Sequence, residues 1–449
     1  MTFVTLPAGY VASNIALEKR ALIFLAVRVG RLLKVAKAGS RVLGIQEKIF
    51  SLEAVMGVRV RVIAGLAVLI AAALWMSGCG HYTCKATFGA STCAPTGSGV
   101  SGGGGSGNSG TPILFAYFAD DNNGNIGAAM LDSAGNFNQL AGFTKPTIPV
   151  AIDGGMVVVQ GKWLYMPLTT LQIVGFSISS SGALTALPGS PYNTNDTFSI
   201  TSDPAGKYLF VGGATQDEVS VFQINQGDGS LTEAAGSPFA TPIPAWQETT
   251  DGLGKFLYVS AGFAGAQVAA YSIDGATGAL TAVAGSPFAF NMTQVKGEAT
   301  GKFLFGVTGQ SGVNGTPIDD HIYVFNINQT TGAITPASGS PFVTLYSPIN
   351  IAVNPKGTLL YSFNEAANGN NSPTEGFQIN ASTGALTEIS GLNTLSLPIG
   401  MFDQSGALLV GHGVGSLTAL NVNSSTGALT SVANVGIGSN FGWAVVDVP

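Results

Sequence analysis

One acidic side chain stands at a sequence position that is otherwise apolar. Three repeated segments place Ile200, Val295 and Ile351 at a matching position, and a fourth segment places Glu248 there. A carboxyl group at such a position has two interpretations. Either it has a raised pKa and works as an acid or base, or it stays charged at a solvated strand edge. The first interpretation makes Glu248 a candidate catalytic residue.

A second candidate for proton transfer is His321, which follows Asp319 and Asp320 in the longest of the repeated loops. An aspartate beside a histidine can support the imidazole as a general base. His412 lies in another loop, within the sequence GHGVG. No nucleophile motif of the G-x-S-x-G type accompanies either histidine, so the alternative is that both are ordinary loop residues.

The sequence offers no complete metal site. The run DDNNGN at 120–125 supplies oxygen ligands, but it does not have the glycine and glutamate spacing of an EF-hand loop. Cys84, Cys93 and the nearby His81 lack a fourth ligand for zinc. We therefore expect no metal and no cofactor, with calcium at 120–125 as the alternative.

These candidates lie on a repeat. A glycine precedes the first clear strand of each unit, and its spacing is 45, 48, 47, 56 and 49 residues, which is typical of blade-type β repeats. Runs such as KFLYV and VAAYSI alternate between Gly-, Asn- and Asp-containing turns, as strands do. The turn sequence TGALT and the sequence GSP followed by an aromatic residue also recur. The repeated glycines are Gly161, Gly206, Gly254, Gly301, Gly357 and Gly406.

The repeat predicts an all-β, seven-bladed propeller over residues 112–449. The first unit, 112–143, has three strands and lacks an innermost one. The last residues, FGWAVVDVP at 441–449, match the innermost strands of other units. We expect this C-terminal strand to complete the first blade and close the ring, which leaves only short, protected edges.

Polar residues also recur just before the predicted inner turn of each unit. Their common position suggests that they cap the turn rather than carry out chemistry. They are Asp203, Asp251, Glu298, Asn354 and Asp403.

The charge distribution excludes a nucleic-acid partner. Residues 1–78 hold ten of the eighteen Lys and Arg residues, including every Arg. From Cys79 onward there are eight Lys and twenty-one Asp or Glu residues, a net charge of 8 − 21 = −13. No basic patch can form there, and the guanidinium fork that clamps phosphate in two places is missing.

The N-terminal part resembles a bacterial lipoprotein signal. At 56–80, two arginines precede a 14-residue apolar run, which is too short to span a membrane, and MSGC follows it. The resemblance implies a signal peptide over 56–78 and lipid attachment at Cys79, although Met76 replaces the usual leucine. The alternative is an ordinary thiol at Cys79 behind a cleavable signal. We interpret residues 1–55 as a misassigned extension; a genuine basic helical segment is the rival.

A linker region, 79–111, follows the predicted anchor. Export would allow Cys84 and Cys93 to form a disulfide that closes a small loop. The Gly/Ser-rich stretch at 97–110 is typical of a flexible tether. We expect a monomer held at the membrane by its lipid, in the periplasm or at the outer membrane.

The repeats resemble the seven-bladed β-propeller lactonases, the family of the propeller-type 6-phosphogluconolactonases. SPINIAVNPKGTLLYS at 347–362 and SDPAGKYLFV at 202–211 carry the family pattern. That family uses His, Arg and acidic side chains at the mouth of the central channel. The equivalent positions of this chain hold neither His nor Arg, so a phosphorylated lactone is the least expected substrate.

Neutral hydrogen-bonding and aromatic residues occupy those family positions instead. Amide and indole groups suit a sugar or another polar, uncharged ligand, and the alternative is that they only line a water-filled channel. The candidate ligand-binding residues are Ser199, Trp246, Gln247, Gln294, Asn350 and Trp443.

We therefore expect a module that binds an uncharged ligand or a partner protein. The alternative is a lactone hydrolase acting on an uncharged sugar-type lactone, with Glu248 or His321 as the base. The sequence leaves it open whether the protein is an enzyme.

Overall fold

The computed structural model describes residues 110–119, 126–146, 155–213, 216–262, 267–309, 319–365, 371–392, 395–413, 415–437 and 442–448. The chain divides into two compact units, 1–102 and 103–449, and all described residues belong to the second. Within those residues, no helix is long and apolar enough to cross a membrane. The predicted anchor, the linker as far as residue 109 and the 120–125 run lie outside the described residues.

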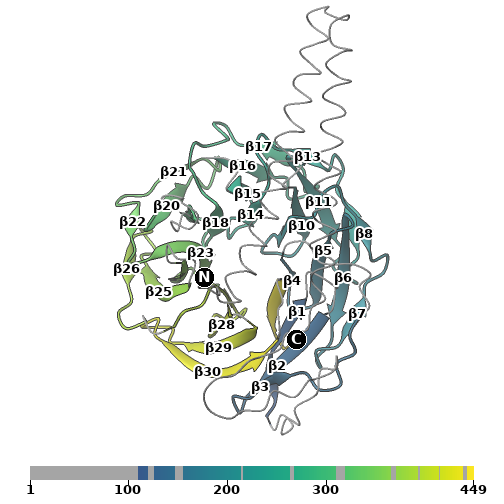
Figure 1. The fold of residues 1–449 in the computed structure, drawn as a ribbon. Helices are drawn as coiled ribbons and strands as arrows, with labels where there is room; N and C mark the ends of the chain where they lie inside the picture. The colour runs from purple at the N-terminus through teal and green to yellow at the C-terminus, as the bar shows by residue number, and fades with distance from the viewer. Residues whose placement is uncertain are drawn as a thin grey trace, which may run out of the picture. The chain divides into compact units, whose positions relative to one another are not determined.

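The described residues form seven antiparallel sheets arranged in a ring, each sheet being one blade (Figure 1). In blades two to seven the strands run from the centre outward in chain order, and in blade one the last strand of the chain takes the innermost place. Blade one contains β31 (Gly442–Asp447), β1 (Pro112–Ala119), β2 (Ile126–Asp132) and β3 (Phe137–Gln139); blade two contains β4 (Val157–Val159), β5 (Trp163–Leu168), β6 (Gln172–Ile178) and β7 (Leu184–Ala186); and blade three contains β9 (Ser199–Ser202), β10 (Tyr208–Gly213), β11 (Glu218–Ile224) and β12 (Leu231–Glu233).

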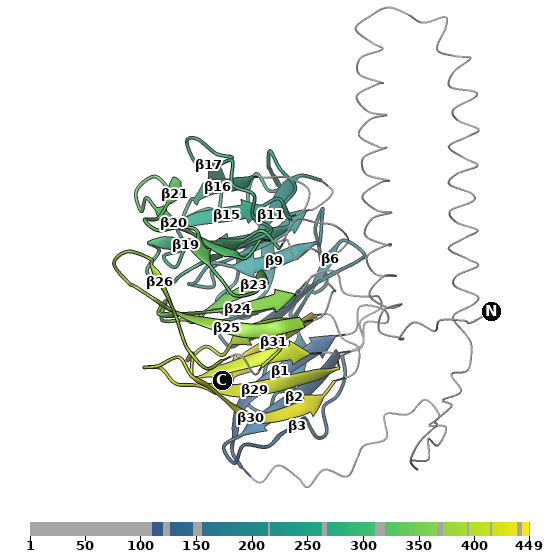
Figure 2. The same ribbon diagram turned by 60° about the vertical axis from the view of Figure 1, so that its left-hand side comes forward.

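The remaining four blades repeat this order, and Figure 2 shows several of them from the side. Blade four contains β14 (Gln247–Thr250), β15 (Phe256–Ser260), β16 (Val268–Ile273) and β17 (Leu280–Ala282); blade five contains β18 (Gln294–Gly297), β19 (Phe303–Val307), β20 (His321–Ile327) and β21 (Ile334–Pro336); blade six contains β23 (Ser347–Val353), β24 (Leu359–Glu365), β25 (Asn371–Ile379) and β26 (Leu386–Glu388); and blade seven contains β27 (Ile399–Phe402), β28 (Leu408–Gly413), β29 (Ser416–Val422) and β30 (Leu429–Gly436).

The C-terminal strand closes the ring, which confirms the prediction. β31 pairs antiparallel with β1, with Trp443 opposite Phe118, and becomes the innermost strand of blade one. The structure adds short strands that the sequence did not predict. β8 (Tyr192–Asn193), β13 (Phe239–Ala240) and β22 (Phe342–Val343) follow the GSP sequences and pair with the third strands of blades two, three and five.

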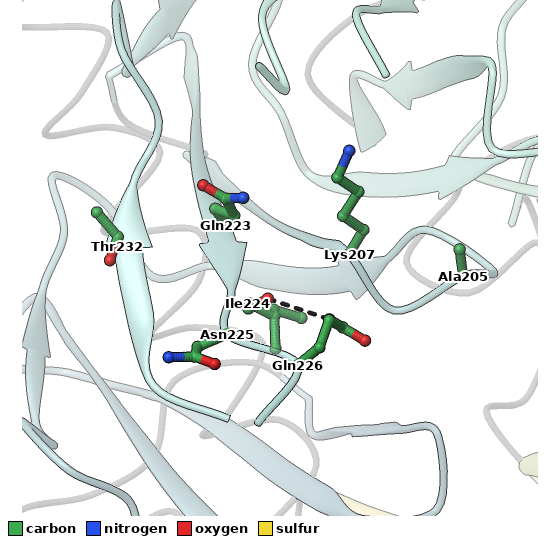
Figure 3. Close-up of a pocket in the computed structure, with 7 residues that line it drawn as sticks. All are labelled: Ala205, Lys207, Gln223, Ile224, Asn225, Gln226 and Thr232. Carbon is green, nitrogen blue, oxygen red and sulfur yellow. Dashed lines mark hydrogen bonds between the residues drawn. The ribbon is translucent and has the colours of Figure 1, made fainter. Parts of the chain in front are cut away.

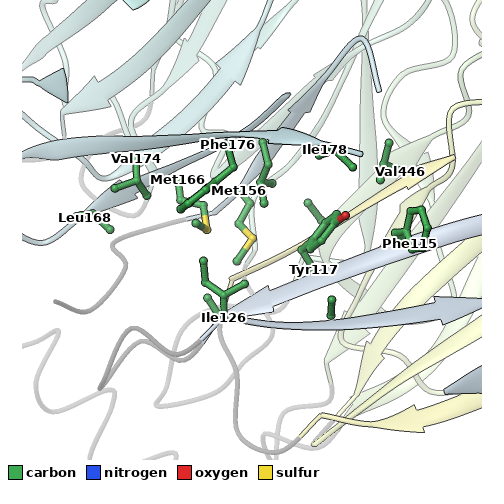
Figure 4. Packing of buried hydrophobic residues seen from close by; sticks show 14 residues of the cluster. Phe115, Tyr117, Ile126, Met156, Met166, Leu168, Val174, Phe176, Ile178 and Val446 are labelled. Atoms are coloured by element: carbon green, nitrogen blue, oxygen red, sulfur yellow. The ribbon is translucent and has the colours of Figure 1, made fainter. Parts of the chain in front are cut away.

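The hydrophobic core is divided among the seven blade interfaces. Each interface holds one cluster of buried side chains, because both faces of every blade are covered by a neighbour. Figure 4 shows the cluster between blades one and two, where Tyr117 lies near Met156 and Ile126. Burying one large apolar side chain stabilises a fold by roughly 1.5–3 kcal/mol, so the ring is held at every interface.

Buried tyrosines connect each of four blades to the next one. Their hydroxyl groups donate to the carbonyl of the glycine in the outer turn of the following blade, at 2.6–3.0 Å, so that this buried hydroxyl is satisfied. Glycine recurs at this turn position because its φ is positive and a side chain there would overlap the neighbouring blade. The pairs are Tyr117–Gly182, Tyr165–Gly229, Tyr258–Gly332 and Tyr361–Gly427.

The polar residues before the inner turns are capping residues, as predicted. In blade four, Asp251 Oδ1 accepts hydrogen bonds from the backbone N–H groups of Lys255 and Phe256 at 2.7 and 2.8 Å. Its Oδ2 accepts the Leu253 N–H at 3.2 Å. Asp203, Glu298, Asn354 and Asp403 make equivalent bonds to their own turns.

Candidate functional site

Four of the predicted ligand-binding positions share one register around the channel. Ser199, Gln247 and Gln294 each begin an inner strand, and Asn350 lies at the matching place in β23. The strand pairs Ser199–Gly212, Gln247–Ser260, Gln294–Val307 and Asn350–Phe363 establish the equivalence. Trp443, opposite Phe118, instead lies at the β31 position that corresponds to Glu248 in blade four. We call this end of the inner strands the upper face of the propeller.

The most unusual contact at the upper face joins two blades. The Ser199 hydroxyl of blade three lies 2.5 Å from Glu248 Oε2 of blade four and donates to it. Glu248 is only 3% exposed, which excludes a charge at a solvated strand edge. Its other oxygen, Oε1, is buried and has no hydrogen-bond partner among the described residues.

A glycine makes room for this carboxyl group. Gly212 lies opposite Ser199 on β10, and a methyl group at Gly212 would overlap Oε1 of Glu248. Oε1 therefore rests against the backbone of β10. Ser199 is partly exposed, so its hydroxyl connects the buried carboxyl to the solvent of the channel.

Burial raises the pKa of Glu248 to about 8. The charged form loses its hydration there, and the negative charge of Asp196 adds to the effect. The Ser199 hydrogen bond and the positive charge of Lys296 act in the opposite direction. Near neutral pH, both forms of the carboxyl are thus accessible, as an acid–base group requires.

Lys296, which sequence analysis missed, belongs to this group. It lies on β18, two residues after Gln294, and is partly buried. Burial lowers its pKa, whereas the nearby Glu248 raises it. A lysine in the segment QVKG resembles an ordinary surface lysine. Its position on an inner strand was the one signal that could have indicated a role in the site.

Two of the predicted ligand-binding amides are bonded to each other. Gln294 Nε2 donates to Asn350 Oδ1 at 2.8 Å, and Gln294 Oε1 accepts the backbone N–H of Ile351 at 2.6 Å. Gln294 is 4% exposed, so its main role is to join blades five and six. Asn350 stays partly exposed.

The two predicted tryptophans each contact another ring, Trp246 in a tilted arrangement and Trp443 in a stacked one. Trp246 lies 4.4 Å from Phe198, measured between ring centroids, and packs over Gly262. Trp443 is stacked on His412 at 6.1 Å. Gln247 is partly exposed at the start of β14.

The predicted Asp–His pair exists but is a separate cluster. His321 Nδ1 lies 2.8 Å from Asp319 Oδ1 and 3.1 Å from Asp320 Oδ1. Asp319 Oδ2 also accepts hydrogen bonds from the hydroxyl groups of Thr308 and Tyr323. The two aspartates and the histidine offer three ligand atoms within 4.8 Å, and exposed groupings of this kind are common without an ion.

His321 does not contact the Ser199–Glu248 pair. It begins β20, the third strand of blade five, whereas Gln294 begins β18, the inner strand. Two strand spacings separate these strands, about 10 Å. The cluster therefore lies at the upper face but farther out along the blade.

A hollow also lies at the opposite face, at the lower end of blade three. Ala205, Lys207, Gln223, Ile224, Asn225, Gln226 and Thr232 line it (Figure 3). Gln226 Nε2 donates to the Ile224 carbonyl at 3.0 Å, so the hollow is built from turn residues that bond one another. It has no part in the Ser199–Glu248 site.

Comparison with known proteins establishes the class of fold. No protein-family model and no curated protein sequence matches the chain. Among solved structures, a provisionally named 6-phosphogluconolactonase from Bacteroides fragilis is 15% identical, with a TM-score of 0.57 over 75% of this chain and 98% of that one. A similarly named protein from Bacteroides uniformis is 14% identical, with a TM-score of 0.56 over 75% and 100% of the two chains.

A third structure, the periplasmic gluconolactonase of Pseudomonas aeruginosa, is 14% identical, with a TM-score of 0.54 over 75% of this chain and 99% of that one. The fold is lactonase-like. At such identities the likeness concerns the fold alone, and the chemistry has to be argued from this chain's own residues.

Proposed function

We propose that this protein hydrolyses an uncharged, sugar-type lactone at the upper face of its propeller, with Glu248 as the acid–base residue. The single observation that supports the proposal is the buried Glu248 carboxyl, whose pKa of about 8 suits proton transfer and whose Oε2 is bonded to a partly exposed hydroxyl. A carboxyl that served only to hold blades together would need partners for both oxygens, as Asp251 has.

The chemistry assigns complementary roles to the two residues. When water attacks the lactone carbonyl, its oxygen forms the new bond to carbon and one of its protons passes to Ser199 Oγ. The Ser199 proton moves to Glu248 Oε2, with which it is already hydrogen-bonded. Collapse of the intermediate breaks the ring C–O bond, and the same two residues return a proton to the departing alkoxide. The product is a hydroxy acid.

An uncharged lactone fits this site better than a phosphorylated one. The described residues contain no arginine, and Lys296 is the single cationic side chain on their inner strands. A doubly charged phosphate is bound tightly by several cationic or backbone donors together. Trp246, Gln247 and Asn350 instead offer an aromatic edge and neutral hydrogen-bonding groups for a sugar ring.

The test compares three forms of the full chain on gluconolactone, its 6-phosphate and simple aliphatic lactones, each measured against spontaneous hydrolysis. We expect turnover of gluconolactone by the wild type and a loss of about 100-fold or more in Glu248→Gln. Glu233→Gln, which changes an exposed carboxyl on β12, is the matched control and should keep full activity. Equal rates in all three proteins would refute the proposal.

A second candidate function is binding of an uncharged glycan or a partner protein without turnover. It is favoured by the bonding of Gln294 to Asn350, which leaves fewer free groups for a reaction centre than the sequence indicated. Specific capture of a glycan by a protein that hydrolyses no lactone would support this candidate. Trp246→Ala should then abolish capture.

We also propose that the protein is exported and held at the membrane by a lipid on Cys79. The signal-like segment 56–80 supports this, and one protein of similar fold is a periplasmic gluconolactonase. Labelled palmitate should enter the wild type and not Cys79→Ser. Labelling of both proteins, or of neither, would contradict lipid attachment at Cys79.

A further inference from the structure

Lys296 is the only Lys or Arg on the inner strands that the structure describes. Its side chain replaces a residue that is small, polar or apolar in every other blade. The residues at the matching inner-strand position are Val157, Thr201, Thr249, Ala352, Met401 and Ala444. The repeated architecture therefore does not require a lysine at this place.

The Lys296 ammonium group has no partner in the described part of the protein. It makes no hydrogen bond and no ion pair there, although it is partly buried. Glu248 is near enough to influence its ionisation, but it does not form a salt bridge with it. Removing water from a cation without providing a hydrogen-bond acceptor costs free energy. An anion bound from solution can provide that acceptor.

A second hydrogen-bond donor lies on the same side of β18. Gln294 and Lys296 are two residues apart, so they project from one face of the strand. Gln294 contacts Asn350 and the Ile351 backbone, so that face is turned toward β23 of blade six. Asn350 uses its Oδ1 for Gln294, and its Nδ2 group makes no hydrogen bond to any described residue.

The charge and the hydrogen-bond donors of Lys296 and Asn350 determine which class of anion fits between them. One ammonium group and one amide N–H match a singly charged carboxylate, which accepts hydrogen bonds at both oxygens. A phosphate dianion would need a second cation that the inner strands do not provide. The neutral groups near the channel, Gln247 and Ser199, can accept or donate hydrogen bonds to hydroxyl groups of the same ligand.

We propose that Lys296 and Asn350 form a carboxylate-binding subsite, which takes a polyhydroxy carboxylate of the aldonate class. The class of ligand rests on the proposed function, because lactone hydrolysis releases such an acid, whereas the anion site itself rests only on Lys296 and Asn350. During hydrolysis, Lys296 stabilises the negative charge that develops on the former carbonyl oxygen. Afterwards it holds the carboxylate product.

The test measures binding of D-gluconate to the full chain by calorimetry, with sorbitol as the uncharged comparison. We expect gluconate to bind more tightly than sorbitol, and Lys296→Met to weaken gluconate binding roughly 10- to 100-fold, the range for losing a hydrogen bond to a charged group. Sorbitol binding should not change. Lys302→Met is the matched control, since Lys302 is exposed in the same blade.

Two further variants separate the contribution of the lysine charge from that of the proposed hydrolysis. Lys296→Gln keeps a hydrogen-bond donor without the charge and should lose most of the affinity for gluconate. Glu248→Gln should still bind gluconate even if it hydrolyses nothing. Equal gluconate affinity in wild type and Lys296→Met, or no gluconate binding at all, would overturn the subsite. Lysine-dependent gluconate binding by a protein that opens no lactone would refute only the proposed hydrolysis.

Discussion

Two buried carboxyl groups lie at opposite ends of the inner strand of blade four, in contrasting surroundings. Asp251, 1% exposed, receives three backbone N–H hydrogen bonds from its own turn. Glu248, 3% exposed, receives one hydroxyl hydrogen bond from the neighbouring blade and leaves Oε1 without a described partner. Both residues are acidic and buried, but only Asp251 accepts hydrogen bonds at both of its carboxyl oxygens.

This difference distinguishes a carboxyl group that stabilises the fold from one that can exchange a proton in a reaction. The Asp251 carboxyl group accepts backbone hydrogen bonds that hold its turn, and three other blades use a carboxyl group and one an asparagine amide in the same way. Glu248 has no counterpart in the other blades, and binding a proton is the main way to relieve its burial. Variants can test whether this contrast is real.

The largest expected effect concerns stability as a function of pH. The pKa of Glu248 is about 8 in the folded protein and about 4.5 when unfolded, so the folded state binds the proton more tightly. Stability should therefore fall as the pH rises from about 4.5 to about 8, by on the order of 5 kcal/mol at about 1.4 kcal/mol per pKa unit. Denaturant unfolding at several pH values should show this fall in the wild type and not in Glu248→Gln. A parallel fall in both proteins would assign it to other groups.

Removing the Asp251 carboxyl group should lower the stability of the fold but leave the rate of lactone hydrolysis nearly unchanged. Asp251→Ala leaves three backbone N–H groups without their acceptor and should destabilise the fold by about 2–4 kcal/mol. Lactone turnover per folded molecule should change little, since Asp251 lies at the far end of β14. The checks are the denaturation midpoint and the rate at a temperature where the variant is folded. A specific loss of rate would remove the distinction between the two carboxyl groups.

The contact between Glu248 and Gly212 should give a smaller effect that depends on both residues. Gly212→Ala places a methyl group where Oε1 lies and should destabilise the wild type by about 1–3 kcal/mol. In the Glu248→Ala background the cost should be lower, because the overlapping group is absent. A double-mutant cycle by denaturation measures the coupling. Additive effects would mean that the carboxyl does not rest on Gly212.

The smallest effect is expected at His321. His321→Gln should change lactone turnover less than about twofold, because its cluster with Asp319 lies about two strand spacings from the inner ring. Steady-state rates of the folded variant provide the measurement. A large loss of rate would move the catalytic site outward from the channel to blade five.

The fold could be predicted from the sequence because every blade repeats the same local signals. Each turn, strand alternation and TGALT sequence carries its own structural information, and the unmatched C-terminal strand could belong only to the incomplete first unit. Glu248 was found in the same way, since a carboxyl in an apolar register stands out against its equivalents.

The contacts of the site could not be predicted in that way. Ser199 and Glu248 are 49 residues apart, and their hydrogen bond depends on how blades three and four pack. The pairing of Gln294 with Asn350, which removed a predicted ligand-binding group, likewise crosses a blade interface. Lys296 was missed because it belongs to no sequence motif. It stands out only in the structure, where its ammonium group makes no hydrogen bond or ion pair to a described residue.

Infrared spectroscopy of the Glu248 carboxyl tests the central claim most directly. The C=O stretch of a protonated, buried carboxylic acid can be assigned by subtracting the spectrum of Glu248→Gln from that of the wild type. We predict that this band is present near neutral pH and disappears with a midpoint of about 8. A carboxyl that is already ionised near pH 5 would contradict the account, because Glu248 would then be a charge that the fold stabilises.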